Sequence, residues 1–533
     1  MKLNLPLPPI PEEQKSDLVR QLLDIIEQEG RIIEQMTEQI QQLKDEIARL
    51  KNQPPRPKIK PSRLEKKRSK KNKSSKGKRP GSEKRHKTSQ LKIHKVQPIE
   101  PEEIPPGSVF KYYKDWVVQD IKVEPFNIRY RLKVYETPGG GYVMGQLPPN
   151  LQGRHYGPAL IRFVLYQHYH CLVTQPLLLE QLHEMGIDIS AGHLNNILIE
   201  NKDRFHTEKD QILSAGLDVS SYINVDDTGA RHKGKNGYCT HIGNELFSFF
   251  ESTQSKSRIN FLKLLRIGHS DYDLNMDAIA YMEANKLPKY VLQPIIANLD
   301  AIFADDRQWN DFLTAKGIIT DRHVQIATEG ALIGSVIEHG ISNDLTIISD
   351  DAGQFNVLVH ALCWIHAERL IAKIIPFTEK QKEDLDTVRD EIWKLYQSLK
   401  RYKKNPRPET KGRLEAKFDQ IFTMKTSSAA LNQALKRLYS NKSELLLVLD
   451  RPEIPLHNNV AENAIREYVK KRKISGGTRS ETGRKCRDTF TSLKKTCRKL
   501  GLSFWEYLKD RIENNGLIPQ LSDLIREQAL RPG

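Results

Sequence analysis

Two short apolar runs, far apart in the chain, each lead directly into a pair of aspartates. The first is Ile-Asn-Val-Asp-Asp (residues 223–227) and the second is Leu-Thr-Ile-Ile-Ser-Asp-Asp (345–351). Short runs rich in β-branched residues predict strands. Ligand-binding groups in open α/β sheets gather at the carboxyl ends of strands. If these two strands are neighbours, Asp226 and Asp350 meet at one edge of an α/β sheet.

The order of the predicted elements narrows the fold class further. Strands are predicted at 238–242 and 246–250, joined by the turn residues Gly243-Asn244. Helical spacing follows, and residues 267–344 are predicted to be mainly helical before the strand at 345–349. Three strands, a helix, a helical insertion, a strand and further helices form the order of a ribonuclease-H-like α/β core.

A third acid, Glu462, lies on a predicted helix that begins near Asn458 and Asn459, residues that favour helix N-caps. Three carboxylates leave room for water and phosphate oxygens, as Mg²⁺ (or Mn²⁺) prefers. Two such ions about 4 Å apart can support in-line displacement at phosphorus. The same helix continues into a run of cations, predicted to hold a DNA backbone together with Arg466: Lys470, Lys471, Arg472 and Lys473.

Other acids compete for these roles. Asp227 and Asp351 are direct rivals, since a lone aspartate after a strand is usually a turn or helix cap. Alternation along a strand favours the first residue of each pair, because successive side chains point to opposite faces. If Glu462 lies far from the aspartates, Glu453 or Glu467 becomes the candidate.

Charge is concentrated in one segment. The chain has 533 residues and a net charge of +17, and residues 56–87 hold 16 Lys and Arg against two Glu. Such a block cannot bury apolar surface and is predicted to be a disordered arm that binds nucleic acid rather than a membrane. Its centre supplies further candidate DNA-binding residues: Lys66, Lys67, Arg68, Lys70 and Lys71.

The five cysteines form no CxxC pair. Their odd number and spacing argue against a disulfide framework and a cysteine zinc site, so no zinc is expected. The first residues lack the apolar core of a signal peptide, and no run approaches the length of a membrane span. These features predict a cytoplasmic protein without a membrane partner.

Residues 15–52 carry a heptad repeat that predicts a parallel two-stranded coiled coil and hence a homodimer. Its alternative is an amphipathic helix docked on its own protein. The a positions are Val19, Ile26, Ile33, Ile40 and Ile47, and the d positions are Leu22, Glu29, Met36, Leu43 and Leu50.

Two further units are predicted between the basic arm and the core. Strands are expected at 108–112, 116–118 and 128–135, which would make a small β unit. Residues 157–214 are predicted to be helical, and a helix ending at Gly186 with another beginning after Ser190 is similar to a helix-turn-helix. Most helix pairs of this kind are packing units, so DNA reading there is a weaker prediction.

Four motifs in order resemble a known family. They are Val225-Asp226-Asp227-Thr228, Ser349-Asp350-Asp351-Ala352-Gly353, Cys363-Trp364-Ile365-His366-Ala367-Glu368-Arg369 and Asn458-Asn459-Val460-Ala461-Glu462. The chain resembles a bacterial insertion-sequence transposase of family sixty-six, of the DDE class. The resemblance covers the coiled coil and roughly residues 157–266 and 345–510.

The resemblance implies a DNA transposase that cuts the ends of its element and joins 3′-hydroxyls to target DNA. Asp226, Asp350 and Glu462 would be its catalytic, metal-binding triad, with His366 and Arg369 near the metal site. DNA, a second copy of the chain and accessory transposition proteins would be its partners on the bacterial nucleoid. Alternatives are an inactive, transposase-derived DNA-binding protein and a stand-alone nuclease of the same fold.

Two departures from the family are visible. Its usual cysteine-rich zinc ribbon is replaced by a region without cysteine, and the stretch 267–344 is longer than expected. The predicted organisation is a coiled coil (1–52), a basic linker (53–97), a β unit (98–150), a helical DNA-binding domain (151–218), the catalytic core (219–510, with helical insertions at 267–344 and 376–450) and a helical tail (511–533).

Overall fold

The computed structural model describes residues 91–148, 151 and 153–531. The chain divides into two units, Met1–Asp120 and Ile121–Gly533, and each is described by itself. Within the first unit, the described residues 91–120 contain no helix or strand. The predicted coiled coil and the basic arm lie outside the described residues. No helix in the described part of the chain is long and apolar enough to cross a membrane.

The predicted small β unit is largely wrong in its details. The structure has no strand at 108–112 or 116–118. Of the predicted strand 128–135, only the last two residues, Val134 and Tyr135, belong to a strand. What forms is a hairpin of β1 (Val134–Glu136) and β2 (Tyr142–Met144), with every residue exposed. Apolar side chains in this region have no core to pack against, and isolated strand pairs are of marginal stability in water.

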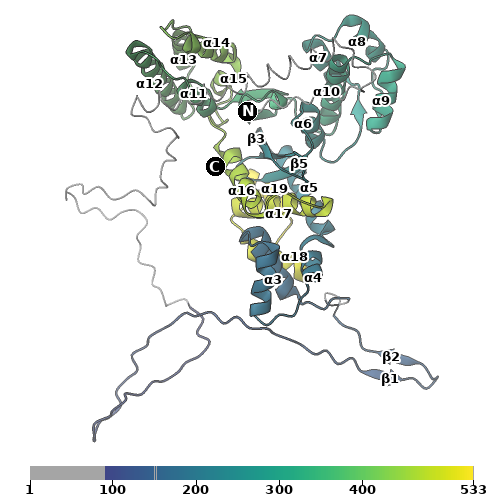
Figure 1. Cartoon of the computed structure of the whole chain (residues 1–533), viewed down its shortest axis with the longest axis vertical. Helices are drawn as coiled ribbons and strands as arrows, with labels where there is room; N and C mark the ends of the chain where they lie inside the picture. Colours follow the sequence, from purple (N-terminus) through teal and green to yellow (C-terminus); the bar gives the residue numbers. More distant parts are fainter. Residues whose placement is uncertain (1–90, 149–150, 152, 532–533) are drawn as a thin grey trace, which may run out of the picture. The chain divides into compact units, whose positions relative to one another are not determined.

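A mixed sheet forms the centre of the second unit, with the strand order β5-β4-β3-β8-β9 (Figure 1). Strands β3, β4 and β5 pair in antiparallel fashion, in the order β5-β4-β3. Strand β8 pairs in parallel with β3, and β9 pairs in parallel with β8. This order is compatible with a ribonuclease-H-like core. Strand β9 was not predicted. The strands are β3 (Tyr222–Gly229), β4 (Tyr238–Gly243), β5 (Ser248–Thr253), β8 (Thr346–Ser349) and β9 (Val359–Leu362).

Strand β8 links two hydrophobic cores because successive side chains alternate across a strand. Ile347 packs into the main core with Ile223 and Val225 of β3. Ile348 packs into a second core, formed largely by the helices that follow β9. Both isoleucines are fully buried. Both faces of β8 are therefore buried, so that the consecutive positions 347 and 348 both need an apolar side chain.

Helix α17 (Glu481–Lys499) covers the edge strand β5 with polar side chains. Asp488 Oδ2, Ser492 Oγ and Thr496 Oγ1 accept hydrogen bonds from the backbone N–H groups of Ser252 (2.9 Å), Phe250 (2.9 Å) and Ser248 (3.1 Å). Four residues of helix rise about 6 Å and two residues of strand about 6.8 Å, so the spacings match. The helix thus satisfies an edge that would otherwise be open.

The helical domain before the sheet follows its prediction closely. Ser190 accepts a hydrogen bond from the backbone of His193 and caps α4, and Gly186 after α3 has a φ of +78°. Whether this pair of helices reads DNA stays a prediction. The elements are α2 (Pro158–Leu165), the π-helical turn η3 (Tyr166–His170), α3 (Gln175–Glu184), α4 (Ala191–Ile199) and α5 (Asp203–Asp218).

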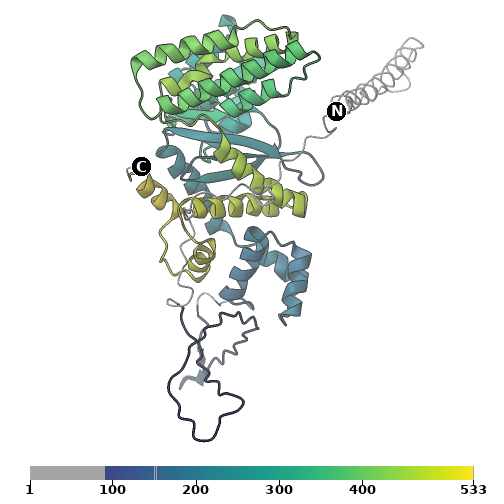
Figure 2. The ribbon, with the colours of Figure 1, turned by 90° about the vertical axis from the view of Figure 1, so that its left-hand side faces the viewer.

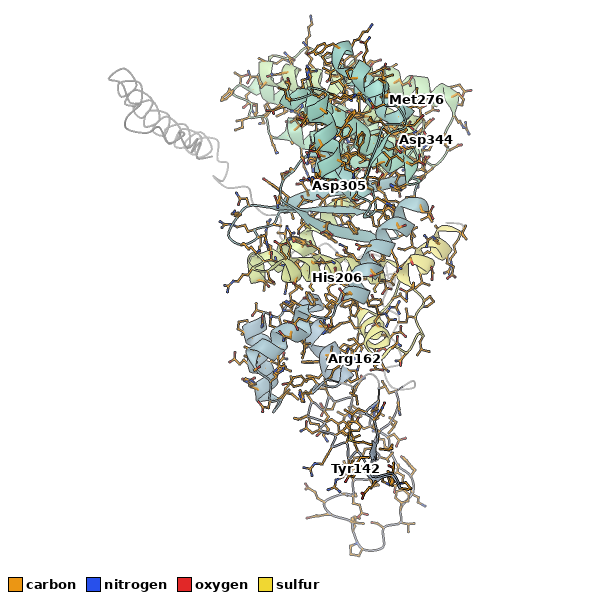
Figure 3. All side chains as sticks on the ribbon, turned by 90° about the vertical axis from the view of Figure 1, so that its right-hand side faces the viewer. Tyr142, Arg162, His206, Met276, Asp305 and Asp344 are labelled. Carbon is orange, nitrogen blue, oxygen red and sulfur yellow. The ribbon has the colours of Figure 1, made fainter. Side chains whose placement is uncertain are left out.

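Both predicted insertions are helical, and they form separate lobes beside the sheet (Figures 1 and 2). Met276, Asp305 and Asp344 mark the first lobe in Figure 3, while His206, Arg162 and Tyr142 mark α5, α2 and β2. The first lobe follows α6 (Arg258–Leu265) and comprises β6 (Tyr272–Asp273), α7 (Met276–Ala284), α8 (Lys289–Ile296), β7 (Ile302–Phe303), α9 (Asp306–Ala315) and α10 (Asp321–Glu338). The second comprises α11 (Trp364–Ala372), α12 (Glu379–Tyr402), α13 (Pro408–Phe422), α14 (Ala429–Ser440) and α15 (Lys442–Leu446).

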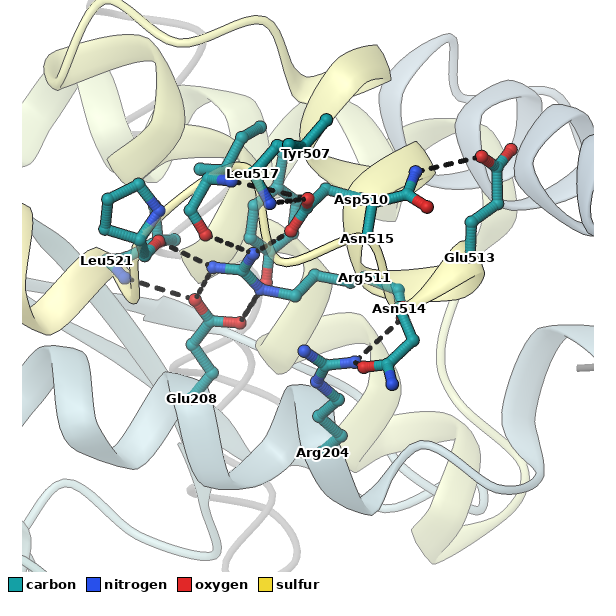
Figure 4. A network of polar contacts seen from close by, with 12 residues as sticks. Arg204, Glu208, Tyr507, Asp510, Arg511, Glu513, Asn514, Asn515, Leu517 and Leu521 are labelled. Atoms are coloured by element: carbon teal, nitrogen blue, oxygen red, sulfur yellow. Dashed lines mark hydrogen bonds and ion pairs between the residues drawn. The ribbon is translucent and has the colours of Figure 1, made fainter. Parts of the chain in front are cut away.

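A buried ion pair ties the C-terminal helices α18 (Phe504–Glu513) and α19 (Leu521–Ala529) to α5 (Figure 4). Both side chains of the Glu208–Arg511 pair are 1% exposed, and their two parallel contacts measure 2.9 Å. Glu208 also accepts hydrogen bonds from the Tyr507 hydroxyl and the Leu521 backbone. Burying such charges is tolerable only because every partner is present.

Breaking this pair is predicted to destabilise the fold strongly. Glu208→Ala removes the two parallel contacts to the buried Arg511 guanidinium and leaves Asp510 as its carboxylate partner, and we expect the free energy of unfolding to fall by about 3 kcal/mol. The control is Asp218→Ala, because the Asp218–Arg526 pair joins α5 to α19 at the surface, with exposed fractions of 63% and 46%. That change should cost about 1 kcal/mol or less. Denaturant unfolding compares the two; equal losses would contradict the prediction.

Candidate functional site

Asp226 lies within β3, not at its end as predicted. The strand continues to Gly229 because it remains paired with β4, where Asp226 is opposite His241. Pairing with β8 stops earlier, at Asn224 and Ile348. Asp226 therefore lies just beyond the parallel pair, at the carboxyl edge where ligand sites form.

Asp350 directly follows β8, as predicted. Because β3 and β8 are parallel neighbours, their carboxyl ends share one edge of the sheet and bring Asp350 to Asp226. Burial and, to a smaller extent, the negative charge of Asp350 raise the pKa of Asp226. The two aspartates that the sequence places 124 positions apart (350 − 226) are thus brought together by one strand pairing.

Asn458 holds the start of helix α16 (Asn459–Ser475) against β3. Its side-chain amide donates to the carbonyl of Val225 at 2.7 Å and its side-chain oxygen accepts from Asn224 at 3.0 Å. Asn458 was expected to cap the helix, but its side chain makes no capping bond. It joins the helix to the strand residue that precedes Asp226, and so brings Glu462, one turn later, to the same edge.

Cys363 and Trp364, at the start of α11, also contact the segment that leads into α16. The Cys363 thiol accepts a hydrogen bond from the backbone of Asn458 at 3.2 Å, and the Trp364 backbone donates to Leu456 at 3.0 Å. Both side chains are buried. The packing role predicted for Cys363 and Trp364 agrees with these contacts.

The carboxylates at this edge repel one another. Burial, followed by the charges of Asp350, Asp227 and Glu462, raises the pKa of Asp226 to about 7, although a hydrogen bond from the Asp227 backbone lowers it. Crowded, partly buried carboxylates are the donor set that hard divalent cations prefer. The residues present therefore fit a Mg²⁺ or Mn²⁺ ion, which would relieve the repulsion.

The rival aspartates have cation partners. Asp227 is paired with Lys256 and accepts from Gln354 at 2.7 Å, and Asp351 is paired with Arg437. Within the described residues, neither Asp226 nor Asp350 forms an ion pair. A carboxylate already neutralised by a side chain is the weaker candidate for a metal ligand, so the geometry favours Asp226 and Asp350.

Glu462 is surrounded by loosely held cations. Its oxygens lie 3.4 Å from Arg369 and from Arg466 and 3.7 Å from His366. Arg369 is 47% exposed and Arg466 65%, whereas the buried Nδ1 of His366 has no hydrogen-bond partner among the described residues. The structure thus brings His366 and Arg369 beside Glu462, and their place near a bound metal stays a prediction. Of the alternative acids, Glu453 is exposed and Glu467 is bonded to Lys470 at 3.1 Å.

The cationic run splits into two groups, which differs from the expectation of one DNA-binding face. Lys470 and Lys473 are exposed. Lys471 is 5% exposed and donates to the carbonyl of His168 at 3.0 Å, while Arg472 bonds Thr228 and Gly229 at the end of β3. A helix directs successive residues to different sides, so the latter two brace the fold. The predicted DNA-binding residues at 66–71 lie outside the described residues.

A hydrogen-bonded chain behind Asp350 was missed by the sequence reasoning. Glu444 accepts from Nδ1 of His360 at 2.9 Å, whose Nε2 lies 2.8 Å from the Ser349 hydroxyl, and this hydroxyl donates to the carbonyl of Asp350. Ser349 is fully buried. The chain fixes the backbone of Asp350. To find this chain of hydrogen bonds from the sequence, strand β9, which carries His360, would have had to be predicted.

Comparison with known proteins fits this geometry. The uncharacterized protein y4jO of Sinorhizobium fredii (strain NBRC 101917 / NGR234) is 45% identical over 321 residues, 60% of this chain and the whole of that protein. The family model described as transposase IS66 family matches residues 344–486. This chain belongs to the IS66 family of transposases. The IS66 match spans Asp350, Cys363, Asn458 and Glu462, and it confirms the resemblance drawn from the motifs.

The raised pKa of Asp226 predicts a pH-dependent stability without divalent ions. An unfolded aspartate has a pKa near 3.9, so between about pH 4 and 7 the folded IS66 protein binds more protons than the unfolded chain. Stability should therefore fall as pH rises, by up to about 1.4 kcal/mol per unit from this group. Denaturant unfolding in EDTA should show a flatter profile for Asp226→Asn but not for Asp351→Asn; identical profiles would refute this.

Removing the Asn458 side chain should loosen the junction. Asn458→Ala leaves the Val225 carbonyl and the Asn224 amide without their partner, so we expect a loss of about 1–3 kcal/mol in unfolding free energy. The control is Asn459→Ala, which alters the exposed neighbour. It should change stability by less than about 0.5 kcal/mol. An equal effect of both variants would mean that the amide contacts contribute nothing.

Proposed function

We propose that this IS66-family protein is a DNA transposase that cuts the ends of its element and joins them to target DNA in a metal-dependent reaction on bacterial chromosomal DNA. The observation that carries this is the convergence of Asp226, Asp350 and Glu462 at one edge of the sheet. Family membership supports the same chemistry. Its substrate class is the phosphodiester backbone.

The three acids would hold the divalent ions, Mg²⁺ or Mn²⁺. When bound, two such ions activate the attacking oxygen and stabilise the leaving oxygen in displacement at phosphorus. Asp226 is fixed by β3 and Asp350 by the Glu444–His360–Ser349 chain, so both carboxylates are presented by rigid backbone. Glu462 depends on Asn458 for its place.

Exposed cations around Glu462 are suited to the DNA backbone. Arg369 and Arg466 each lie 3.4 Å from Glu462 and retain solvent exposure. In our proposal they turn from Glu462 to phosphate oxygens when DNA binds, joined by Lys470 and Lys473 of the same helix. Such contacts add affinity without sequence readout, and they weaken as salt rises.

Sequence recognition and pairing of the two element ends belong to other segments. The basic arm would add salt-sensitive affinity and the coiled coil would pair protomers, so that two ends are held together before cleavage. The helices α3 and α4 are the candidate reading unit, because Ser190 and Gly186 set a defined turn between them. Accessory transposition proteins would be further partners.

The test uses the full chain and duplex DNA carrying the sequences that flank its gene. Asp350→Asn should lower Mg²⁺-dependent cleavage by more than about 100-fold, beyond the loss expected for an outer contact of a metal site. DNA binding in a gel-shift assay should persist. The matched control, Asp351→Asn, breaks only an exposed ion pair. It should retain activity within about fivefold.

Each other result of this assay assigns a different function. Binding by the wild-type chain without cleavage would identify an inactive DNA-binding protein, and cleavage without joining would identify a nuclease. Full activity of Asp350→Asn, or equal losses in the two variants, would refute the proposed triad.

A further inference from the structure

A second cluster of ligand-type side chains lies in the first helical lobe, away from the acids at the sheet edge. One ligand atom from each of His269, Asp271 and His339 lies within 4.8 Å of the other two. His269 and Asp271 belong to the loop between α6 and β6, and His339 ends α10. Two imidazoles and a carboxylate from two separate segments converge at this point.

Asp271 is held as an oriented carboxylate. Its Oδ1 lies 2.8 Å from Nε2 of His339 and its Oδ2 accepts from the Ser335 hydroxyl at 2.9 Å. The guanidinium of Arg266 binds the backbone carbonyl of Asp271 and not its carboxylate. One oxygen therefore stays directed at the histidines while the other is fixed by an outer partner, as in many metal sites.

The two histidine rings stack closely, with centroids 3.5 Å apart and planes 12° apart. Nitrogen atoms of both rings therefore lie close to the Asp271 carboxylate. His339 also lies at the C-terminal end of α10, where the helix dipole favours a cation.

The backbone before His269 is strained. Ile267 has a φ of +55° and Gly268 a φ of +84°. A β-branched residue rarely adopts this left-handed region, and such strain gathers at ligand clamps and functional turns. The conformation turns the loop sharply after α6 and presents His269 next to His339.

The surroundings favour a cation as well. Asp273 is 4% exposed and, within the described residues, forms no ion pair. The charges of Glu338, Asp271 and Asp300 act on it. A divalent ion among these acids would reduce the excess of negative charge in the lobe.

We propose that His269, Asp271 and His339 form a binding site for a transition-metal ion of the zinc class. Imidazole nitrogens with a carboxylate suit Zn²⁺ better than Mg²⁺ or Ca²⁺. The expectation of no zinc was based on cysteine spacing, and this cluster uses none. Ligand atoms around a tetrahedral ion with bonds of about 2.0–2.1 Å lie about 3.4 Å apart. The exposed ring of His269 has to turn inward to complete the site.

The ion would join the loop after α6 to the end of α10. Residues 340–345 connect α10 to β8, which leads to Asp350. The metal would thus clip the two points at which the lobe joins the sheet. Its role is structural, and it is independent of the reaction proposed above.

The test measures zinc binding by the full chain, with any affinity tag removed and metals stripped by EDTA. Equilibrium dialysis against ZnCl₂ in excess Mg²⁺, with metal quantified by plasma emission, should give one zinc per chain. His269→Gln and Asp271→Asn should each weaken binding at least about tenfold. His323→Gln, a change on α10 outside the cluster, is the matched control and should bind like wild type.

Two further readouts keep the result clear. His269 is exposed, so its variant should fold normally, and Co²⁺ substitution should give visible absorption in wild type but not in that variant. Zinc should also raise the melting temperature of wild type alone. Absence of zinc binding, or undiminished binding in both variants, would overturn the site. Asp226→Asn should keep the zinc, which separates this test from that of DNA cleavage.

Discussion

The candidate active site depends on the Asn458 amide more than on any other single contact. It bonds the backbone of β3 next to Asp226 while its own backbone is held by Cys363, so a strand, a helix and a loop meet at one residue. Hydrogen bonds of this kind contribute little net stability when made, but their loss leaves buried groups unsatisfied. The position of Glu462 relative to the aspartates therefore follows from satisfying these few polar groups.

The carboxylates at this edge of the sheet are held close together although their negative charges repel when no cation is bound. Packing and strand pairing force Asp226 into a partly buried place beside other carboxylates, and its pKa is raised by this burial and, to a smaller extent, by their charges. Asp227 and Asp351 have cation partners that relieve part of the charge, whereas Asp226 and Asp350 form no ion pair with any described residue. The fold provides the energy that holds the remaining carboxylates together, and a bound cation would recover it.

Sequence patterns predicted the elements that are long or strongly apolar. The run before Asp350, the cap at Ser190 and both helical insertions were found where they were expected. Strand β9 was missed because His360 interrupts a short run, and the strands at 108–112 and 116–118 were wrong because β-type residues there have no core to cover. Among candidate site residues, the sequence could indicate the acids by type and spacing. It could not separate Lys471 and Arg472, which point inward, from Lys470 and Lys473, because the facing of a helix is set by tertiary packing.

The polar stripe of α17 has a consequence for how copies of this chain behave when crowded. An exposed edge strand offers a template on which another chain can add a strand. Here Asp488, Ser492 and Thr496 already occupy the backbone donors of β5, and a helix cannot pass the ladder on to a further strand. In the proposed function, protomers gathered on one DNA molecule would be at high local concentration. At this edge they would meet a closed surface, which disfavours indiscriminate strand pairing there.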